Sequence, residues 1–391
     1  MTEERKDIVG KARRILVKVG SGVLTTSNGI DEKIIKNLAD EIALLSRRGL
    51  QFVIVSSGAI ASGRGRMKFS GPLKSLPQKQ AAAAVGQRIL MDVYSRAFDK
   101  HGIAVAQMLL TMSDLVDRRR YLNTRNTLST LMEWKVIPII NENDTVSVEE
   151  IRFGDNDTLA AMMANIMEAN LLINLTNTEG LYDRNPRRDS GTAVLIPLVK
   201  EITEEIESFT SSEADPSGTG GMKSKVMAAR RVTAFGIPCI IAPGRRKGVL
   251  EDILEGNETG TLFLPTKTHM TSKKYWIAYT LRSRGKLHID DGAAAAVIEK
   301  GKSLLPSGIV RVEGDFAVGD PVTCVDAKGT SIAKGLVNYC AADLEKIKGL
   351  KTSRIEQVLG SKPYDEVIHR DNMAVSKSAS KTTDRDTSAG S

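Results

Sequence analysis

The sequence predicts an α/β protein, with an open, mostly parallel sheet sandwiched by helices and a small β-rich domain after it. Up to about residue 265, short runs of apolar and β-branched residues alternate with amphipathic stretches. This alternation is typical of buried parallel strands joined by crossover helices. From about residue 282, short alternating segments punctuated by Gly and Pro replace the pattern, which predicts a separate β-rich domain.

Each predicted strand is a short apolar run that ends in a cluster of small or polar residues. Continuous apolar runs of this length are typical of strands that are buried on both faces. The runs are 15–19 (ILVKV), 52–55 (FVIV), 136–140 (VIPII), 171–175 (LLINL) and 237–241 (IPCII).

The stretches between these runs are predicted to be helices. In 33–48, Ile35, Leu38 and Ile42 recur on one helical face, and Gly49 is placed to end the helix. Similar patterns predict helices over 78–100, 119–133, 156–168 and 222–235. Because strand and helix alternate, right-handed crossovers place helices on both faces of the sheet.

Changes in composition mark the expected domain boundaries. We expect the sheet domain over residues 12–265, a linker over 266–281, and the β-rich domain over 282–361 with one helix near 291–300. The tail over 376–391 contains no residue typical of a core, so we expect it to be disordered.

Length and composition exclude several classes of protein. With 391 residues, 41% hydrophobic and 26% charged, the chain is too long for a lone binding module and typical of globular proteins. No apolar run approaches the roughly 18 residues of a membrane span, and the charged start lacks a signal-peptide core, so we expect a cytoplasmic protein. Three scattered cysteines and four unclustered histidines argue against disulfides and against a metal site in the chain.

Polar clusters follow the predicted strands, at the edge where open α/β sheets bind ligands. In the first cluster, Lys18 lies near the end of its strand and Gly20, Ser21 and Gly22 follow. This arrangement sets a cation beside a turn whose backbone N–H groups can approach phosphate closely. The alternative is a strand lysine that reaches solvent before an ordinary turn.

A glycine-rich loop, SGTGGMKSK over 217–225, precedes an Ala-rich helix. Its glycines allow a tight backbone wrap, and the N-terminus of the helix favours an anion. It is not a Walker A loop, because Met222 stands where that motif needs Gly. A flexible glycine linker is the alternative. The residues that we expect to contact a nucleotide here are Thr219, Gly220, Gly221, Met222, Lys223, Ser224 and Lys225.

The segments NENDTV (141–146) and GDNDT (154–158) supply two carboxylates and two amides. Asn141 and Asp144 follow a strand, and Asn156 and Asp157 begin a helix. A polar amino-acid substrate needs this mixture, a carboxylate for its ammonium group and amides for its carboxylates. Helix capping is the alternative explanation for Asp157.

The segment SSGAIASG over 56–63 is the fourth cluster. Ser57, Gly58 and Ala59 combine small side chains with backbone donors, which suit a carboxylate or a phosphoryl oxygen. Helix capping explains the serines equally well.

Together these clusters favour phosphoryl transfer, a reaction that depends on positioning and charge neutralisation more than on covalent chemistry. Lys18 and Lys225 would flank the transferred group, and Asp157 would hold both ammonium groups in place. The sequence offers no Ser/His/Asp set and no metal cage. We therefore expect Mg²⁺ to be carried largely by the phosphates of ATP.

The ordered motifs closely resemble the bacterial glutamate 5-kinases of the amino acid kinase superfamily. They are VKVGSGVLT, IVSSGAIASG, INENDTVSVEEIRFGDNDTLAA, LTNTEGLYDRNP and GTGGMKSKVMAA. The C-terminal region resembles a PUA domain, and the resemblance covers about residues 12–373. It implies ATP-dependent phosphorylation of the side-chain carboxylate of L-glutamate in the first step of proline biosynthesis, with proline as feedback inhibitor. It also suggests a homotetramer, or dimers that associate further.

By motif position, the resemblance also implies residue roles. Lys18 and Lys225 would contact the ATP phosphates and stabilise the transition state, and Asp157 would organise them. Glutamate would be held by Ser57, Asp144 and Asn156, with Asn141 nearby, and the nucleotide would be bordered by Thr176, Asn177 and the loop from Thr219 to Lys225. Members of the family often carry Asp where this chain has Asn177, so a charged contact to the nucleotide would here be neutral.

Two alternatives remain open at this point. An aspartate, acetylglutamate or carbamate kinase would share the phosphate-binding parts and differ in the acceptor. An RNA-binding protein is the alternative from another class, because PUA domains occur in RNA-modifying enzymes and the net charge of +8 suits nucleic acid as well as nucleotides. Residues 284–360 hold eleven Lys and Arg against ten Asp and Glu, a balance of +1, which weakens this alternative.

Overall fold

A computed structural model describes residues 3–26, 29–69, 71–146, 156–186, 188–189, 191–210, 221–266, 274, 277–278 and 281–376. The chain divides into two compact units, Met1–His269 and Met270–Ser391. Each unit has its own buried core, and each is described by itself.

The first unit is built on a sheet that contains eight strands among the described residues. All neighbouring strands are parallel except β9 and β10, which are antiparallel. In spatial order the strands are β5 (Val105–Leu110), β6 (Ile137–Glu142), β4 (Gln51–Ser56), β1 (Arg14–Val19), β7 (Leu171–Thr176), β9 (Cys239–Pro243), β10 (Thr261–Phe263) and β8 (Leu198–Val199). A separate two-stranded ribbon joins β2 (Thr25–Thr26) to β3 (Gly29–Ile30).

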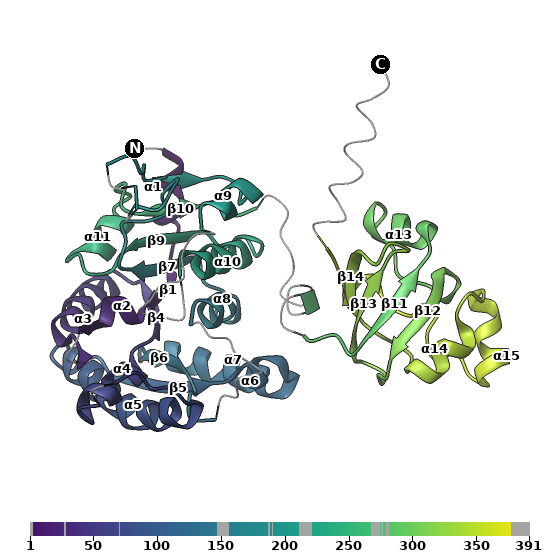
Figure 1. Ribbon diagram of the computed structural model, residues 1–391, viewed down its shortest axis with the longest axis horizontal. Helices are drawn as coiled ribbons and strands as arrows, with labels where there is room; N and C mark the ends of the chain where they lie inside the picture. Colours follow the sequence, from purple (N-terminus) through teal and green to yellow (C-terminus); the bar gives the residue numbers. More distant parts are fainter. Residues whose placement is uncertain are drawn as a thin grey trace, which may run out of the picture. The chain divides into compact units, whose positions relative to one another are not determined.

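Helices cover both faces of this sheet (Figure 1). One layer packs on the first core and comprises α1 (Glu3–Gly10), α3 (Glu32–Arg47), α5 (Leu76–Asp99) and α11 (Val249–Leu254). The other layer packs on the second core and comprises α6 (Met112–Val116), α7 (Arg118–Glu133), α8 (Asn156–Ile166) and α10 (Met222–Thr233). Short helices α2 (Ser21–Leu24), α4 (Ala59–Arg66) and α9 (Glu204–Ser208) complete the unit. Among the described residues, none of the helices combines the length and apolar character that a bilayer span requires.

The alternation of side chains along β1 decides which of them point to each face of the sheet. Ile15 and Val17 belong to the core under α3 and α5, whereas Leu16 belongs to the core under α8 and α10. Successive side chains of a strand point to opposite faces, so Lys18 shares the face of Leu16. The sequence thereby directs a buried cation toward α8 and α10.

The predicted strands and helices of the first unit are present, with ends that differ by up to two residues. The strand predicted over 237–241 begins later, at Cys239. Pro238 precedes it and has no N–H to donate to the sheet, although its carbonyl accepts a hydrogen bond from the N–H of Leu172 in the neighbouring strand. The prediction missed β5, β8 and β10. Polar Gln107 interrupts the apolar run of β5, and the other two strands are only two or three residues long.

The second unit contains a sheet with the strand order β12-β11-β13-β14-β15 among the described residues. The strands are β11 (Gly285–Ile289), β12 (Ile309–Gly314), β13 (Pro321–Val325), β14 (Ser331–Leu336) and β15 (Met373–Val375). The helices are α13 (Asp291–Ile298), α14 (Ala341–Ile347) and α15 (Ile355–Leu359), with short turns η3 (Pro306–Gly308), η4 (Thr352–Arg354) and η5 (Arg370–Asn372). The helix predicted near 291–300 corresponds to α13.

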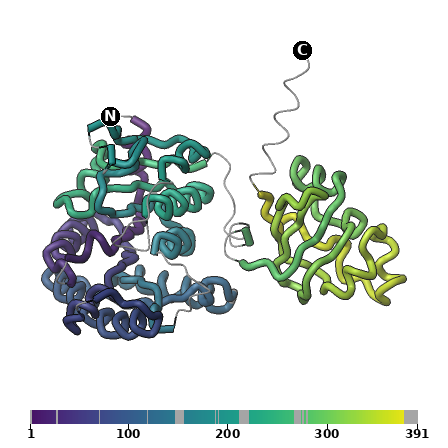
Figure 2. The backbone as a smooth tube through the Cα atoms, viewed as in Figure 1, coloured from purple at the N-terminus to yellow at the C-terminus, as the bar shows by residue number. Residues whose placement is uncertain are grey.

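This unit continues past residue 361, where the sequence analysis placed its end. The chain returns to lay β15 beside β14, as the yellow end of the tube shows (Figure 2). Val367 and Ile368 are buried in the same core, which ties the segment to the sheet. A three-residue strand after a turn-rich segment gives too weak a periodic signal to be predicted. Most of the predicted tail, from residue 377 onward, lies outside the described residues.

Helices α4 and α5 approach each other so closely that only glycine fits at the contact. A Cβ atom on Gly86 would lie 1.8 Å from the carbonyl oxygen of Ala59, and one on Gly63 would lie 1.8 Å from that of Ala82. Because α4 begins directly after Ser57 and Gly58, this contact also fixes the loop at the end of β4.

We expect Gly86→Ala to lower the free energy of unfolding by about 1–3 kcal/mol, because the added methyl group overpacks a helix contact that cannot yield. Urea unfolding followed by circular dichroism measures the change. Gly10→Ala on α1 is the matched control, since a Cβ there meets nothing within 4 Å. Equal stability of the two variants would contradict the close-packing argument.

Candidate active site

The carboxyl ends of β1, β4, β6 and β7 meet at one edge of the sheet, and the polar clusters gather there. Lys18 lies beside Asn174 of β7 on one side and Val55 of β4 on the other. The parallel register therefore brings residues that are far apart in sequence to one place, as expected for an open α/β sheet.

The centre of the site is the carboxylate of Asp157, in the first turn of α8. Its Oδ1 forms an ion pair with Lys18 Nζ and accepts a hydrogen bond from Asn174 Nδ2 at 2.8 Å. Its Oδ2 accepts from Ser224 Oγ at 2.7 Å and lies 3.4 Å from Lys225 Nζ. Four elements, β1, β7, α8 and α10, thus meet on one carboxylate.

Burial raises the electrostatic cost of this arrangement of charges. The side chain of Asp157 is fully buried, and those of Lys18 and Lys225 are 3% and 7% exposed. Two cations share one anion, so these three groups carry a formal charge of +1 where water is largely absent. Buried unbalanced charge is costly unless a counter-charge joins it. The centre therefore favours an anionic ligand such as a phosphoryl group.

The start of α10 adds to this centre. Gly221 is its N-cap, and Ser224 Oγ, which has one proton to donate, lies 2.8 Å from the Gly221 carbonyl oxygen and 2.7 Å from Asp157 Oδ2. Lys223 points away and is exposed. The predicted contact residues Thr219 and Gly220 lie outside the described residues.

The turn after β1 lies against the same centre. A Cβ atom on Gly20 would be 3.8 Å from Lys18 Nζ, and Gly20 is the N-cap of α2, which begins at Ser21. On Gly22, a Cβ atom would be 3.5 Å from Asn177 Nδ2. Only small residues leave this space open beside the lysine.

A cavity of about 70 Å³ opens beside Lys225 and includes several residues that the sequence predicted for the nucleotide. Those are Thr176, Asn177, Gly221, Met222 and Lys225. The sequence analysis did not single out other residues that line it, Thr178, Gly180, Leu181, Tyr182, Arg184, Asn185, Pro186 and Phe209. Most of these belong to the LTNTEGLYDRNP motif, which is the sequence feature that could have identified them.

A second group of polar side chains lies on the other side of β1. Asn156 Nδ2 donates to Ser57 Oγ at 2.8 Å and to Asn141 Oδ1 at 3.0 Å. Gly58, after Ser57, has a left-handed φ of +103° and turns the chain into α4, where Ala59 is buried. Ser57, Asn141 and Asn156 therefore come together, directly next to Asp157.

Asp144 lies three residues beyond Asn141 and is half-buried. Burial, together with the neighbouring charge of Glu142, raises the pKa of its carboxyl group to about 6. Within the described residues, no hydrogen bond joins this carboxylate to Ser57 or Asn156. Its charge therefore remains available to a ligand.

The sequence analysis missed three polar residues in the buried part of the site. Asn174 interrupts the apolar run LLINL, which is a usable signal, since a polar residue inside a buried strand needs a partner. Tyr94 and Gln87 on α5 gave no such signal. Tyr94 OH lies 3.0 Å from Ser56 Oγ, and Gln87 Oε1 accepts from Asn141 Nδ2 at 2.9 Å.

In the part of the chain that the structure describes, this centre has no cage for a metal. Among the described residues, no three His, Cys, Asp or Glu side chains cluster as metal ligands would. Both oxygens of Asp157 already face ammonium groups.

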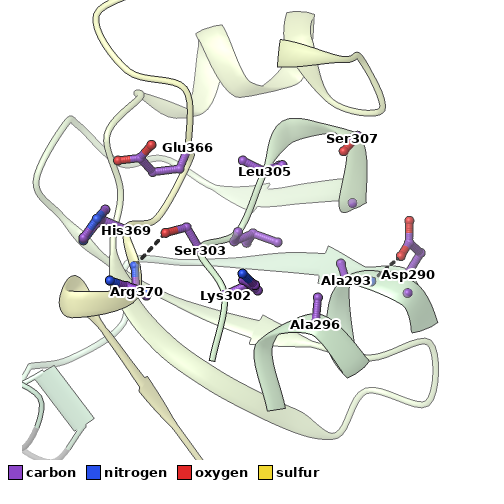
Figure 3. A pocket seen from close by; sticks show the side chains of 13 residues that line it. Asp290, Ala293, Ala296, Lys302, Ser303, Leu305, Ser307, Glu366, His369 and Arg370 are labelled. Atoms are coloured by element: carbon purple, nitrogen blue, oxygen red, sulfur yellow. Dashed lines mark hydrogen bonds between the residues drawn. The ribbon is translucent and has the colours of Figure 1, made fainter. Parts of the chain in front are cut away.

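A second cavity, of about 700 Å³, lies within the second unit (Figure 3). Lys302 and Arg370 line it together with the acidic Asp290 and Glu366, and the backbone N–H of Arg370 donates to Ser303 Oγ at 3.0 Å. This mixture of charges differs from the basic stripe of a dedicated nucleic-acid surface.

Comparison with known families agrees with the fold. The Amino acid kinase family matches residues 13–243, which include Lys18, Asp157 and Lys225. The PUA domain family matches residues 285–359, within the second unit. The class that fold and site define is an amino acid kinase with an added PUA domain.

Individual relatives narrow this class. The chain is 66% identical to the glutamate 5-kinase of Syntrophus aciditrophicus over 96% of its length and 97% of the relative. It is 50% identical to that of Syntrophotalea carbinolica and 49% identical to that of Geobacter sulfurreducens, each over 95% of this chain and 100% of the relative. The chain belongs to the glutamate 5-kinase family.

We expect Asp157→Asn to lower the free energy of unfolding by about 3–5 kcal/mol, because two buried ammonium groups lose their shared counter-charge. Urea unfolding measures this. Asp92→Asn breaks an exposed pair with Arg88 on α5 and is the control, with an expected change below about 1 kcal/mol. Similar losses in both variants would show that the buried carboxylate does not hold the lysines together.

Proposed function

We propose that this chain transfers the γ-phosphoryl group of ATP to the side-chain carboxylate of L-glutamate. The products are L-glutamyl 5-phosphate and ADP, and the reaction is the first step of proline biosynthesis. The buried carboxylate of Asp157, which holds the ammonium groups of Lys18 and Lys225 together, carries the proposal. The high identity to the glutamate 5-kinases supports the choice of acceptor.

In this reaction a carboxylate oxygen of glutamate attacks the γ-phosphorus, and the bond from that phosphorus to the β–γ bridging oxygen breaks. The negative charge on the transferred group must be stabilised by charges that are already in place, so that the solvent does not have to reorganise during the reaction. Lys18 and Lys225 supply two fixed positive charges. Asp157 is their positioning residue, since it keeps both ammonium groups at one point while the phosphoryl group passes between donor and acceptor.

The nucleotide would lie on the β7 side of this centre. The backbone N–H of Ser21 and those at the start of α10 are placed for its phosphates, together with the side chains of the loop over 219–225. The cavity lined by Thr176, Asn177 and Met222 would take the part of the nucleotide beyond the phosphates. Asn177 offers a neutral amide there.

Magnesium, when bound, would neutralise charge on the β- and γ-phosphates. We propose that the phosphates themselves provide most of its ligands, because both oxygens of Asp157 face ammonium groups and no cage surrounds the centre in the described part of the chain. The protein's own charges and the metal would thus act on different oxygens.

Glutamate would lie on the β4 side. We assign its ammonium group to Asp144 and to the amide oxygen of Asn156, and its carboxylates to Ser57 and the backbone donors of Gly58 and Ala59. Asn141 orients Asn156 through a hydrogen bond of 3.0 Å. Each polar group on the β4 side of the site, the acceptor half, thus has one role in binding glutamate.

The raised pKa of Asp144 predicts a pH dependence of glutamate use. Below a pKa of about 6 the carboxyl group is protonated and attracts the substrate ammonium group only weakly. We expect kcat/KM for L-glutamate to fall about tenfold per pH unit below that value, as the free enzyme loses its ionised base. Initial rates between pH 5 and 8, where glutamate itself stays ionised, measure the profile.

Asp144→Asn should lower kcat/KM at neutral pH and remove the acid limb of the profile. If the limb near pH 6 persists in this variant, another group is responsible for it.

Hydroxylamine trapping of the acyl phosphate tests the proposed reaction. ATP and Mg²⁺ are supplied with L-glutamate, L-aspartate, N-acetylglutamate or carbamate in parallel, and ADP release is the check. We expect hydroxamate from L-glutamate alone. A signal with another acceptor would overturn the substrate assignment and keep the phosphoryl-transfer chemistry, and no signal with any acceptor would overturn both.

Proline inhibition, self-assembly and a cytoplasmic location complete the proposal. Suppression of the hydroxamate signal by proline tests the first. Leu122 on α7 and Trp134 directly after that helix are 39% and 70% exposed and support the proposed homotetramer. Sedimentation of the full chain measures the assembly.

A further inference from the structure

A row of buried side-chain amides connects α5 to the acceptor half of the site. Gln87 Oε1 accepts from Asn141 Nδ2 at 2.9 Å, and Asn141 Oδ1 accepts from Asn156 Nδ2 at 3.0 Å. Asn156 Nδ2 also donates to Ser57 Oγ at 2.8 Å. Gln87 and Asn141 are only 8% and 2% exposed, so the row is shielded from water at its centre.

A single backbone donor sets the direction of the whole row. The N–H of Glu142 donates to Asn141 Oδ1 at 2.9 Å, and a backbone N–H has no acceptor alternative. Asn141 must therefore present its oxygen to Asn156 and its nitrogen to Gln87. It follows that Gln87 turns its oxygen toward Asn141, and that Asn156 turns its nitrogen toward Asn141 and Ser57.

The row leaves one polar atom unsatisfied at each end. Asn156 Oδ1, an acceptor, and Gln87 Nε2, a donor, are buried with no hydrogen-bond partner among the described residues. Unpaired buried polar atoms are rare and costly, so such an atom at a binding site indicates a missing ligand group. The acceptor on Asn156 suits an ammonium group.

We infer that Gln87 is a positioning residue for the amino-acid substrate, because its acceptor locks the amide row that presents Asn156 Oδ1 to the substrate ammonium group. The inference rests on the function proposed above, which assigns Asn156 to that group. Without Gln87 Oε1, Asn141 Nδ2 is a buried donor without a partner. The Asn141 amide is then anchored only through its Oδ1, and it can tilt away from Asn156.

The packing of α5 suits this role. Gly86, next to Gln87, is held against Ala59 of α4 by the close approach described above. Ala59 follows Ser57 by two residues. The helix that carries Gln87 and the loop that carries Ser57 therefore cannot move independently, and the amide row keeps its length.

The test compares two ligands that differ in one group, L-glutamate and glutarate, which lacks the ammonium group. In Gln87→Met we expect the KM of L-glutamate to rise about tenfold, as for loss of one hydrogen bond to a desolvated group. The inhibition constant of glutarate and the KM of ATP should stay within about twofold. Equal weakening of both ligands, or no change in either, would overturn the inference.

Two further variants separate positioning from stability. Gln87→Glu keeps an oxygen toward Asn141 and should restore the preference for L-glutamate over glutarate, so a tenfold loss there would also overturn the inference. Leu90→Ala, a fully buried change further along α5, is the matched control. It should lower the melting temperature and leave that preference unchanged.

Asn156→Ala distinguishes this inference from the proposed function. If Asn156→Ala loses the preference for L-glutamate and Gln87→Met keeps it, the inference fails and the proposed function stands. If Asn156→Ala keeps the preference, the assignment of Asn156 to the ammonium group fails and the inference fails with it. Loss in both variants supports both.

Discussion

One buried carboxylate that serves two ammonium groups is the constraint on which the structure depends. Asp157 lies at the start of α8, Lys18 near the end of β1, and Lys225 in the first turn of α10. These elements must meet within hydrogen-bond distance, because any one of these charges alone would be costly in this interior. Three features bring these elements together. They are the alternation of side chains along β1, the parallel register of β1 with β7, and Gly221 at the start of α10. The formal charge of these three side chains together is +1, which suits an anionic ligand.

Much of this architecture follows from the sequence. The apolar runs predicted the central strands, and the rule that parallel strands share an edge predicted that the polar clusters would converge there. Periodicity alone did not give the pairings across that edge. The contact between Lys225 and Asp157 depends on how α8 and α10 pack, which is a property of the core between them and not of either segment. The chemistry of phosphoryl transfer placed Asp157 between Lys18 and Lys225, and the family resemblance implied the same roles.

The features that escaped prediction share a physical cause. Gln87 and Tyr94 lie in α5, whose amino-acid composition is typical of a helix, and their partners belong to other elements. A buried polar side chain is satisfied by tertiary contacts, so its own neighbours in sequence carry no trace of its role. Asn174 is the exception, since an amide inside LLINL conflicts with its surroundings. Short edge strands such as β8 and β15 escaped because two or three residues show no period.

The central position of β1 gives the reaction a direction within the sheet. The residues assigned to the nucleotide follow β7, and those assigned to glutamate follow β4 and β6, so donor and acceptor approach from opposite sides of one strand. Neighbouring strands lie about 4.8 Å apart, which makes the path from β7 to β4 about 10 Å. Donor and acceptor would therefore meet above the end of β1, with Lys18 beneath the midpoint, because an in-line transfer needs the attacking oxygen within about 3–3.5 Å of the phosphorus. Strand spacing, a constant of every sheet, would set how far each ligand must extend to reach that point.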